Sequence, residues 1–317
     1  TADRVAMIEK AVDEGFNVIV MPGYAFGGAI VEAAPEFPDV KFIALDVAAG
    51  DLLETAVAKA GEAYDYTPEN WDLNKYVDMS NVYCAVYQEE LCGYMAGYAA
   101  VKLGYKNLGF LGGMSVPAVV RYGYGFVQGV DAAAADLGLT DVKLNYIYGG
   151  QFFGDADITA VMDTWYQGGT EVVFACGGGI YTSAVEAALK SNGYVIGVDV
   201  DQNYIGVNGV ADGSFAYNPF ITSAMKGLTE AVNTALSDIE AGDWSDIAAS
   251  NGNFGLEDGD YIGLPTDADS WNFETFTTDE YEALKSKIKS GEITVDNSSD
   301  DSTKPTVSEF TTVNYIQ

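Results

Sequence analysis

Residues 172–203 read VVFACGGGIYTSAVEAALKSNGYVIGVDVDQN and contain both kinds of segment from which the rest of the chain is built. The unbroken apolar run Val172–Cys176 is typical of a strand buried on both faces of a parallel sheet. Three glycines follow it, and Thr182–Ser191 then has the composition of a helix. A second apolar run, Val195–Val198, ends in Asp199. This order of strand, helix and strand predicts a βαβ unit.

The same alternation continues in both directions along the chain. Helical spacing is clear at Ile158, Val161, Met162 and Trp165, which lie at i, i+3, i+4 and i+7. Further apolar runs that we expect to form strands are Phe16–Met21, Val40–Asp46, Val82–Tyr87, Leu108–Leu111 and Val142–Tyr148. The pattern predicts an α/β fold of mostly parallel sheets flanked by helices, and 317 residues suffice for two lobes.

The end of the chain has a different composition. Residues 290–317 include VDNSSDDSTKPTVSEF, which is polar and acidic and has no helical period. Residues 311–316 are rich in strand-forming side chains. We therefore expect a surface tail or a strand that returns to one of the sheets.

Composition excludes several classes of function. The chain has 47 acidic and 15 basic residues, and its formal net charge of −32 repels phosphate backbones and anionic lipid. It has no histidine, which rules out Ser-His-Asp triads, Cys-His dyads and histidine metal sites. Cys84, Cys92 and Cys176 form no CxxC pair and lie in apolar contexts. We expect buried thiols, and no catalytic residue, metal site or nucleic-acid partner.

The ligand site is expected where the strands end, because ligands of open α/β sheets bind outside the carboxyl ends of the strands. Gly112-Gly113 and Gly177-Gly178-Gly179 each follow a predicted strand. Neither cluster has the spacing of a dinucleotide-binding or P-loop motif. Both suit main-chain contact with a ligand, and both suit an ordinary tight turn equally well.

Asp199 ends a predicted strand in the segment GVDVDQN, residues 197–203. Its two carboxylate oxygens suit a pair of sugar hydroxyls, and a capping or solvated turn is the alternative. Asp-x-Asp-x-Asn also resembles the start of a calcium loop, but position twelve is Val210 instead of Glu. Calcium is therefore not expected.

Aromatic rings and one cation complete the set of candidates. Rings at strand ends can stack on a flat base or a sugar face, and any one of them is also an ordinary packing residue. They are Tyr24, Phe26, Tyr122, Tyr181 and Tyr217. Lys226, in Ser223-Ala-Met-Lys226, is expected on a largely apolar helix, where it either donates to a ligand oxygen or extends to solvent.

Several segments, in order and over most of the chain, resemble the basic membrane protein family of ABC-transporter substrate-binding proteins. The longest are VIVMPGYAFGGAIVEAAPEFPDVKFIALD (18–46) and YQEELCGYMAGYAAVKLGYKNLGFLGGMSVPAVVRYGYGFVQGV (87–130). The others are VVFACGGGIYTSAVEAAL (172–189), VIGVDVDQ (195–202), TSAMK (222–226) and FTTDEYEALKSKIKSGEI (276–293). Their order and spacing make the resemblance more specific than any single motif.

The resemblance implies a two-lobed type I periplasmic-binding-protein fold with a purine nucleoside in the cleft. The amino-terminal lobe would comprise residues 1–105 and 219–250, the carboxyl-terminal lobe 106–218 and 251–275, and residues 276–317 a terminal helix and acidic tail. The base would lie between aromatic rings, and acidic, glycine-backbone and lysine groups would meet the ribose. Carried over by position, the ligand-binding residues are Tyr24, Gly178, Gly179, Tyr181, Asp199 and Lys226.

The chain also departs from the family pattern. Family members begin with a strand and an Asp-x-Ser-Phe-Asn-like segment that contacts the base, and the resemblance places this segment before Thr1. The first strand of the amino-terminal lobe is therefore expected to be missing from residues 1–105. The turn GGGIY, residues 177–181, differs from the more usual Gly-x-Thr-Gly.

We therefore expect an extracytoplasmic solute-binding protein without a cofactor, which delivers a purine nucleoside to an ABC permease. No run approaches the roughly 18 apolar residues of a membrane span, so membrane attachment is expected only through a lipid anchor outside this sequence. Three alternatives remain: a receptor for a monosaccharide or signalling sugar, a surface antigen or scaffold that binds no ligand, and a carboxylate-based nucleoside hydrolase.

Overall fold

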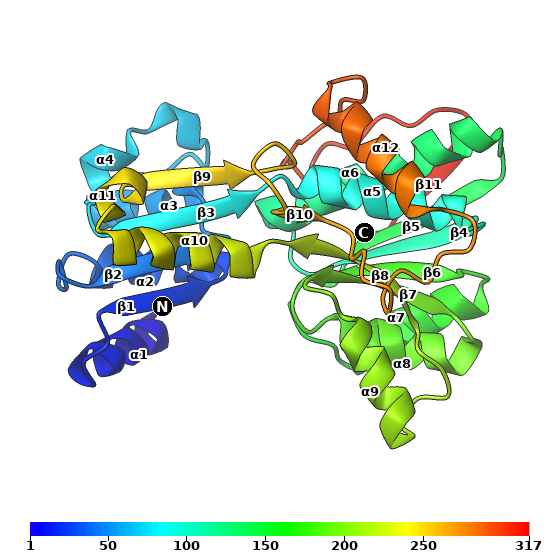
Figure 1. Cartoon of the computed structure of the whole chain (residues 1–317), viewed down its shortest axis with the longest axis horizontal. Coiled ribbons are helices and arrows are strands. Elements are labelled where there is room, and N and C mark those ends of the chain that lie inside the picture. Colours follow the sequence, from blue (N-terminus) through cyan, green and yellow to red (C-terminus); the bar gives the residue numbers. More distant parts are fainter. Residues whose placement is uncertain (317) are drawn as a thin grey trace. The chain divides into compact units, whose positions relative to one another are not determined.

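The structure is a computed structural model that describes residues 1–316 (Figure 1). Its internal contacts divide the chain into two compact units. Unit 1 comprises Thr1–Tyr87 and Leu228–Phe254, and unit 2 comprises Gln88–Gly227 and the chain from Gly255 onward. The predicted lobe boundaries differ from these, most of all at residue 105. Helix α5 (Glu89–Lys102) causes this difference, because it packs against helix α6 (Pro117–Leu137) of unit 2.

Unit 1 is built on a four-stranded parallel sheet in the order β1-β2-β3-β9. Its core is apolar and includes Met21, Ile30, Phe42 and Leu52. The strands are β1 (Val18–Pro22), β2 (Lys41–Leu45), β3 (Val82–Tyr87) and β9 (Ser250–Phe254). The helices are α1 (Ala2–Asp13), α2 (Gly27–Ala33), α3 (Ala49–Lys59), α4 (Leu73–Tyr76), α10 (Leu228–Ala241) and α11 (Trp244–Ile247), with 3-10 turns η1 (Tyr24–Phe26) and η2 (Pro68–Asn70).

Unit 2 contains a seven-stranded sheet in the order β10-β8-β7-β6-β4-β5-β11, in which only the β10–β8 pair is antiparallel (Figure 1). The strands are β4 (Asn107–Gly112), β5 (Val142–Tyr148), β6 (Val172–Cys176), β7 (Tyr194–Asp199), β8 (Phe220–Lys226), β10 (Ile262–Gly263) and β11 (Thr311–Tyr315). Besides α5 and α6, the helices are α7 (Ala156–Gln167), α8 (Tyr181–Ser191), α9 (Asn203–Asp212) and α12 (Thr278–Lys289). The predicted α/β architecture of mostly parallel sheets is confirmed.

One predicted helix is wrong. Residues 220–226 form strand β8, and Lys226 is its last residue. The segment contains the helix formers Ala224, Met225 and Lys226, but it pairs with β7 on one side and β10 on the other. This pairing inside the sheet outweighs the weak local propensity.

The acidic end of the chain is part of unit 2. Strand β11 pairs in parallel with β5, as the return-strand alternative predicted. Upstream of it, the Gln128 side chain on α6 donates to the Asp296 carbonyl at 3.0 Å and accepts from the Asp296 amide at 2.8 Å. Asp131, one turn further along α6, accepts from the amide and hydroxyl of Ser308, both at 2.8 Å. The tail is therefore held along one face of α6.

Glycines allow α5 and α6 to approach closely. A side chain on Gly93 of α5 would overlap the main-chain carbonyl of Tyr122, and one on Gly125 of α6 would overlap that of Glu90. This contact sets the start of α5 against the first turns of α6, where the site described below is built. Within residues 1–316, no helix has both the length and the apolar composition needed to cross a membrane.

Candidate functional site

Asp199 is the last residue of β7 and has a left-handed backbone conformation, with φ of 66°. Few residues other than glycine adopt this conformation, and it often marks sites of function. Two buried hydrogen bonds hold the turn: the Val198 amide donates to Oε1 of Gln202, and the Gln202 amide donates to Oγ of Ser223, both at 3.0 Å. The Asp199 side chain remains 33% exposed. Asp199 therefore presents a partly exposed carboxylate from a well-held turn at the carboxyl edge of the sheet.

Lys226 lies beside Asp199 because their strands are neighbours. In the register of β7 and β8, Asp199 is opposite Met225, and Lys226 follows directly. Nζ of Lys226 lies 3.3 Å from Oδ1 of Asp199 and 5.3 Å from the centre of the Tyr122 ring. The Lys226 side chain is only 3% exposed. A buried ammonium with an ionic partner and an aromatic face is a stable arrangement, whereas an unpaired one is not.

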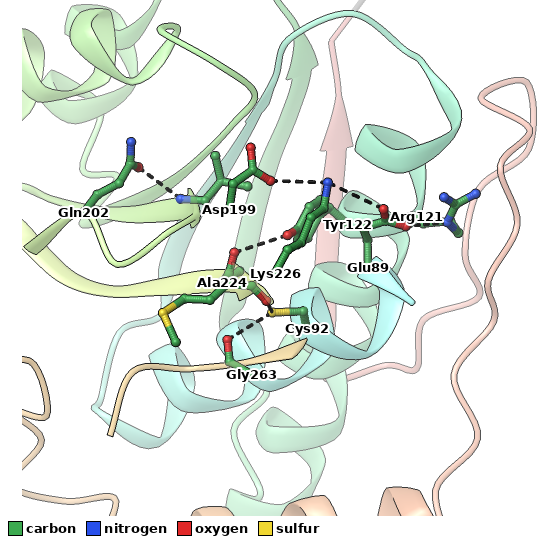
Figure 2. Close-up of polar contacts among 11 residues, drawn as sticks. Glu89, Cys92, Arg121, Tyr122, Asp199, Gln202, Ala224, Lys226 and Gly263 are labelled. Carbon is green, nitrogen blue, oxygen red and sulfur yellow. Dashed lines mark hydrogen bonds and ion pairs between the residues drawn. The ribbon is translucent and has the colours of Figure 1, made fainter. Parts of the chain in front are cut away.

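Figure 2 shows that the pair is part of a row of four charges. Nζ of Lys226 also lies 3.5 Å from Oε1 of Glu89, at the start of α5. Oε2 of Glu89 accepts a hydrogen bond from Nε of Arg121, on α6, at 2.6 Å. The Glu89 side chain is 1% exposed and that of Arg121 is 19% exposed. Two cations thus alternate with two carboxylates, which balances charges that are costly to bury alone.

Glu89 and Arg121 were not predicted from the sequence. Acidic residues are common in the first turn of any helix, where they interact with the helix dipole. An arginine in a helix is likewise unremarkable. The one available signal was the pair of glycines in α5, Gly93 and Gly97, whose close packing against α6 brings Glu89 and Arg121 together.

A second buried carboxyl group lies next to Glu89. Glu90 is 5% exposed, and its Oε2 atom has no hydrogen-bond partner within residues 1–316. Burial, and then the negative charge of Glu89, raise the pKa of Glu90 to about 7, while Arg121 acts in the opposite direction. This side chain can gain or lose a proton near neutral pH.

The side chains that lie next to the four charges are buried and unreactive. The Tyr122 hydroxyl donates to the carbonyl of Ala224 at 3.2 Å, and the Cys92 thiol lies 3.2 Å from the carbonyl of Gly263 (Figure 2). Burial raises the pKa of Cys92 to about 12. It also raises that of Cys84 to about 12, and that of Cys176 well above its ordinary value. The prediction of three buried thiols is confirmed.

The glycine turn after β6 accommodates a neighbouring loop. Gly178 has a left-handed φ of 53°, and the Gly179 amide donates to the carbonyl of Phe152 at 2.7 Å. A side chain on Gly177 would meet the Phe152 ring at 2.8 Å. Phe153 forms an isolated bridge with Gly179, and its side chain is 60% exposed. Sequence reasoning missed this loop and with it an exposed ring at the carboxyl edge of β6.

Of the remaining predicted residues, Tyr181 belongs to unit 2 and lies apart from the charge row. Tyr181 begins α8, and its ring packs on Phe220, the first residue of β8, whereas Lys226 is the last. Tyr24 lies in the turn η1 of unit 1. The structure therefore brings Asp199 and Lys226 together and does not add Tyr181 to them. Within residues 1–316 no cluster of acidic or cysteine side chains is suited to a metal ion.

A family model described as Bmp, the PnrA-like ABC transporter substrate-binding proteins, matches residues 1–299. The chain belongs to this family. Among curated relatives, the Bmp-family chain is 27% identical over 247 residues to a protein of Lactococcus lactis subsp. cremoris named "ABC transporter nucleoside-binding protein BmpA". The match covers 75% of this chain and 60% of the relative. Basic membrane protein A of Borreliella burgdorferi is 27% identical over 300 residues, which are 91% of this chain and 73% of that protein.

The chain thus spans about 60% of the length of the first of these relatives and 57–58% of three further Borrelia and Borreliella basic membrane proteins. Solved structures support the fold. A solute-binding protein of an ABC transporter system from Aeropyrum pernix K1 aligns with a TM-score of 0.68 at 20% identity, covering 95% of this chain and 83% of that one. Another, from Conexibacter woesei, gives 0.63 at 21% identity, with 92% and 83% covered. The predicted type I periplasmic-binding-protein fold is confirmed.

Proposed function

We propose that this chain captures a purine nucleoside at the Asp199–Lys226 pair and delivers it to an ABC permease. Asp199 would accept hydrogen bonds from two ribose hydroxyls, and Lys226 would donate to a ribose oxygen. The observation that carries the proposal is a strand-end carboxylate, fixed in a left-handed turn, with a buried ammonium 3.3 Å away.

The hydrogen-bonding chemistry of the pair favours hydroxyl groups. An ionised carboxylate only accepts hydrogen bonds, and an ammonium only donates them. A hydroxyl group does both, so adjacent hydroxyls on a sugar can satisfy both side chains. A phosphate would bring negative charge to a position between Asp199 and Glu89, in a chain with a net charge of −32. A neutral nucleoside avoids this repulsion.

The name of the Lactococcus lactis relative supports a nucleoside as the ligand, since that protein is called nucleoside-binding. A flat base needs an apolar or aromatic face as well as polar contacts. In unit 2, the exposed ring of Phe153 lies beside Gly179 and is our candidate for that face. Tyr24, Gly178, Gly179 and Tyr181 stay in the proposal as further contacts.

Location and partner follow from the family. ABC transporter substrate-binding proteins act outside the cytoplasm and pass their ligand to a permease, and we propose the same for this chain, with a lipid anchor outside the present sequence. A nucleoside hydrolase is less well supported. The two carboxylates of the row, Asp199 and Glu89, both contact Lys226, which favours binding over acid–base work.

Isothermal titration calorimetry with adenosine, guanosine, inosine, cytidine, ribose and galactose tests the proposal. Purine nucleosides should bind, and Asp199→Ala should weaken that binding by about 100-fold. Thermal unfolding provides a second reading, because a ligand at about 100 times its Kd adds about 2.7 kcal/mol of stability. Binding of none of the six by folded protein would refute a nucleoside or simple sugar as the ligand and favour a scaffold or antigen.

A sugar receptor is the second candidate, because the Asp199–Lys226 pair recognises hydroxyls whether or not a base is attached. Ribose or galactose would then bind as tightly as any nucleoside in the same titrations. Release of free base from a nucleoside, followed by chromatography, would support the hydrolase instead.

A further inference from the structure

The four charges of the site are joined end to end. Arg121 contacts Glu89 at 2.6 Å, Glu89 lies 3.5 Å from Lys226, and Lys226 lies 3.3 Å from Asp199 (Figure 2). Three contacts therefore separate Arg121 from the carboxylate that is proposed to meet the ligand. We propose that Arg121 is a positioning residue for ligand binding and that it acts through Glu89. This inference rests on the function proposed above.

Glu89 contacts a different cation with each of its two carboxylate oxygens. Oε2 accepts from Arg121, and Oε1 faces the ammonium of Lys226. The Glu89 side chain is 1% exposed, so solvent cannot readily take the place of a lost partner. Without Arg121, both oxygens would be drawn to Lys226, and in this poorly hydrated environment the attraction is strong. The ammonium would move toward Glu89 and away from Asp199.

Loss of that contact would affect the ligand directly. Nζ of Lys226 neutralises Asp199 and fixes the direction of its carboxylate. Loss of this contact would leave the Asp199 carboxylate less constrained, and ordering it again on binding would reduce the affinity. Arg121 itself therefore need not touch the ligand to change how tightly the ligand binds.

The main chain around the row is rigid enough for such an effect. Gly93 and Gly125 set α5 and α6 in close contact, so Glu89 and Arg121 project from two helices that cannot shift independently. Lys226 ends a strand of the same sheet as Asp199. Sites carried by helices and strands hold their side chains more accurately than sites carried by loops.

A double-mutant cycle tests the route of action. We would measure the Kd of the best-bound purine nucleoside for wild type, Arg121→Met, Glu89→Gln and the double variant. Charge-assisted hydrogen bonds predict a loss of about 10-fold for Arg121→Met and about 30-fold for Glu89→Gln. The double variant should bind no more weakly than Glu89→Gln, because Arg121 acts only through Glu89. Wild-type affinity in Arg121→Met, or losses that multiply, would overturn the proposal.

Lys190→Met is the matched control. Lys190 also bridges two carboxylates, with Nζ 3.1 Å from Asp163 and 3.0 Å from Glu186, but its side chain is 49% exposed on α8. Its loss should leave the Kd unchanged. If Arg121→Met folds poorly, two other variants take its place. The double variant leaves no unpaired buried carboxylate at position 89, and Arg121→Lys keeps the positive charge. The Kd of each is then compared with that of Glu89→Gln.

A measurement on the protein without ligand tests this inference separately from the proposed function. The side-chain 15Nζ resonance of Lys226, assigned with Lys226→Met, should shift in Arg121→Met and stay in place in Lys190→Met. If wild type binds no nucleoside but the resonance shifts, the proposed function fails and the row stands. If wild type binds and the resonance is unmoved, the positioning role of Arg121 fails alone. A purely structural Arg121 would lower the melting temperature without changing either reading.

Discussion

The two units differ in the number and the kind of polar side chains that they bury. Among residues 1–316, the buried polar side chain of unit 1 is Asn81, whose amide donates to the carbonyls of Ala34, Phe37 and Val40. Unit 2 buries several, including the ionisable side chains of Glu89, Glu90 and Lys226. A buried amide that joins loops serves the fold. Buried charges cost stability unless they are paired, and their concentration in one place indicates a binding role.

The units also share a feature that sharpens this contrast. Each has an aspartate in the left-handed conformation where a central apolar strand ends: Asp46 after β2, with φ of 59°, and Asp199 at the end of β7, with φ of 66°. Backbone geometry alone therefore does not distinguish them. Our proposal for Asp199 rests on the buried ammonium of Lys226 beside it.

The largest effect is expected from Glu90, the buried carboxyl of unit 2. Burial raises its pKa to about 7. The folded protein therefore binds this proton more tightly than the unfolded chain, and the free energy of unfolding falls by about 3 kcal/mol as pH rises from about 4.5 to about 7. Glu90→Gln should remove this decline and be more stable than wild type at pH 8. Urea unfolding at several pH values measures it.

Glu9→Gln is the control in unit 1, where Glu9 is exposed on α1. This variant keeps Glu90, so it should show the same decline in stability as wild type when the pH rises. Parallel pH profiles for Glu90→Gln and wild type would show that Glu90 is not held neutral by the fold.

The next largest effect is expected when one of the two strand-end aspartates is replaced by alanine. Asp199→Ala should weaken nucleoside binding by about 100-fold, since it removes a charged acceptor and leaves Lys226 less well paired. Asp46→Ala should change the Kd by less than about threefold. Calorimetric titration of both variants decides the matter. Equal losses would mean that both units contact the ligand through these residues, and the contrast drawn above would fail.

Asn81→Ala should cost about 2 kcal/mol of stability, because three carbonyls in buried or partly buried positions lose their donor. Hydrogen exchange should accelerate around residues 34–42 of unit 1, and the Kd of the folded protein should not change. The contrasting variant is Thr222→Val in unit 2. The Thr222 hydroxyl is buried without a hydrogen-bond partner within the described chain, so its removal should be neutral or stabilising.

The smallest effects should come from exposed ion pairs. Lys190→Met in unit 2 and Lys10→Met in unit 1 each remove a lysine whose side chain is about half exposed or more. Exposed pairs contribute about 0.5 kcal/mol or less. Urea unfolding should place both variants within that range of wild type. A larger loss for Lys190 would show that surface charges of unit 2 also stabilise it.

Much of the fold was predictable because it depends on local patterns. The apolar runs that we assigned to β1–β7 all form strands, and Val172–Cys176 and Asp199 lie where the βαβ pattern placed them. Two kinds of strand escaped prediction. Strand β8 contains helix formers, and β9 (SNGNF) has no apolar pattern at all, yet each is fixed by pairing with a neighbouring strand.

The candidate site was predictable only in part. Asp199 and Lys226 entered through a motif and a resemblance, and the structure brings them to 3.3 Å. Gly178 and Gly179 stay predicted ligand contacts, and the structure shows in addition that the glycines after β6 give room to Phe152. The sequence near Gly177 does not indicate that a phenylalanine from another loop fills the space next to this glycine.

Periodicity, apolar runs and turn residues act over a few neighbouring positions, so they were enough to specify parallel α/β units and a carboxylate at the end of β7. The row from Arg121 through Glu89 and Lys226 to Asp199 has a different origin. Arg121 and Glu89 are 32 positions apart and meet because glycines let α5 and α6 touch. Lys226 faces Asp199 because β8 takes its place beside β7. Such contacts depend on how whole elements pack, and packing between distant segments leaves no local pattern in the chain.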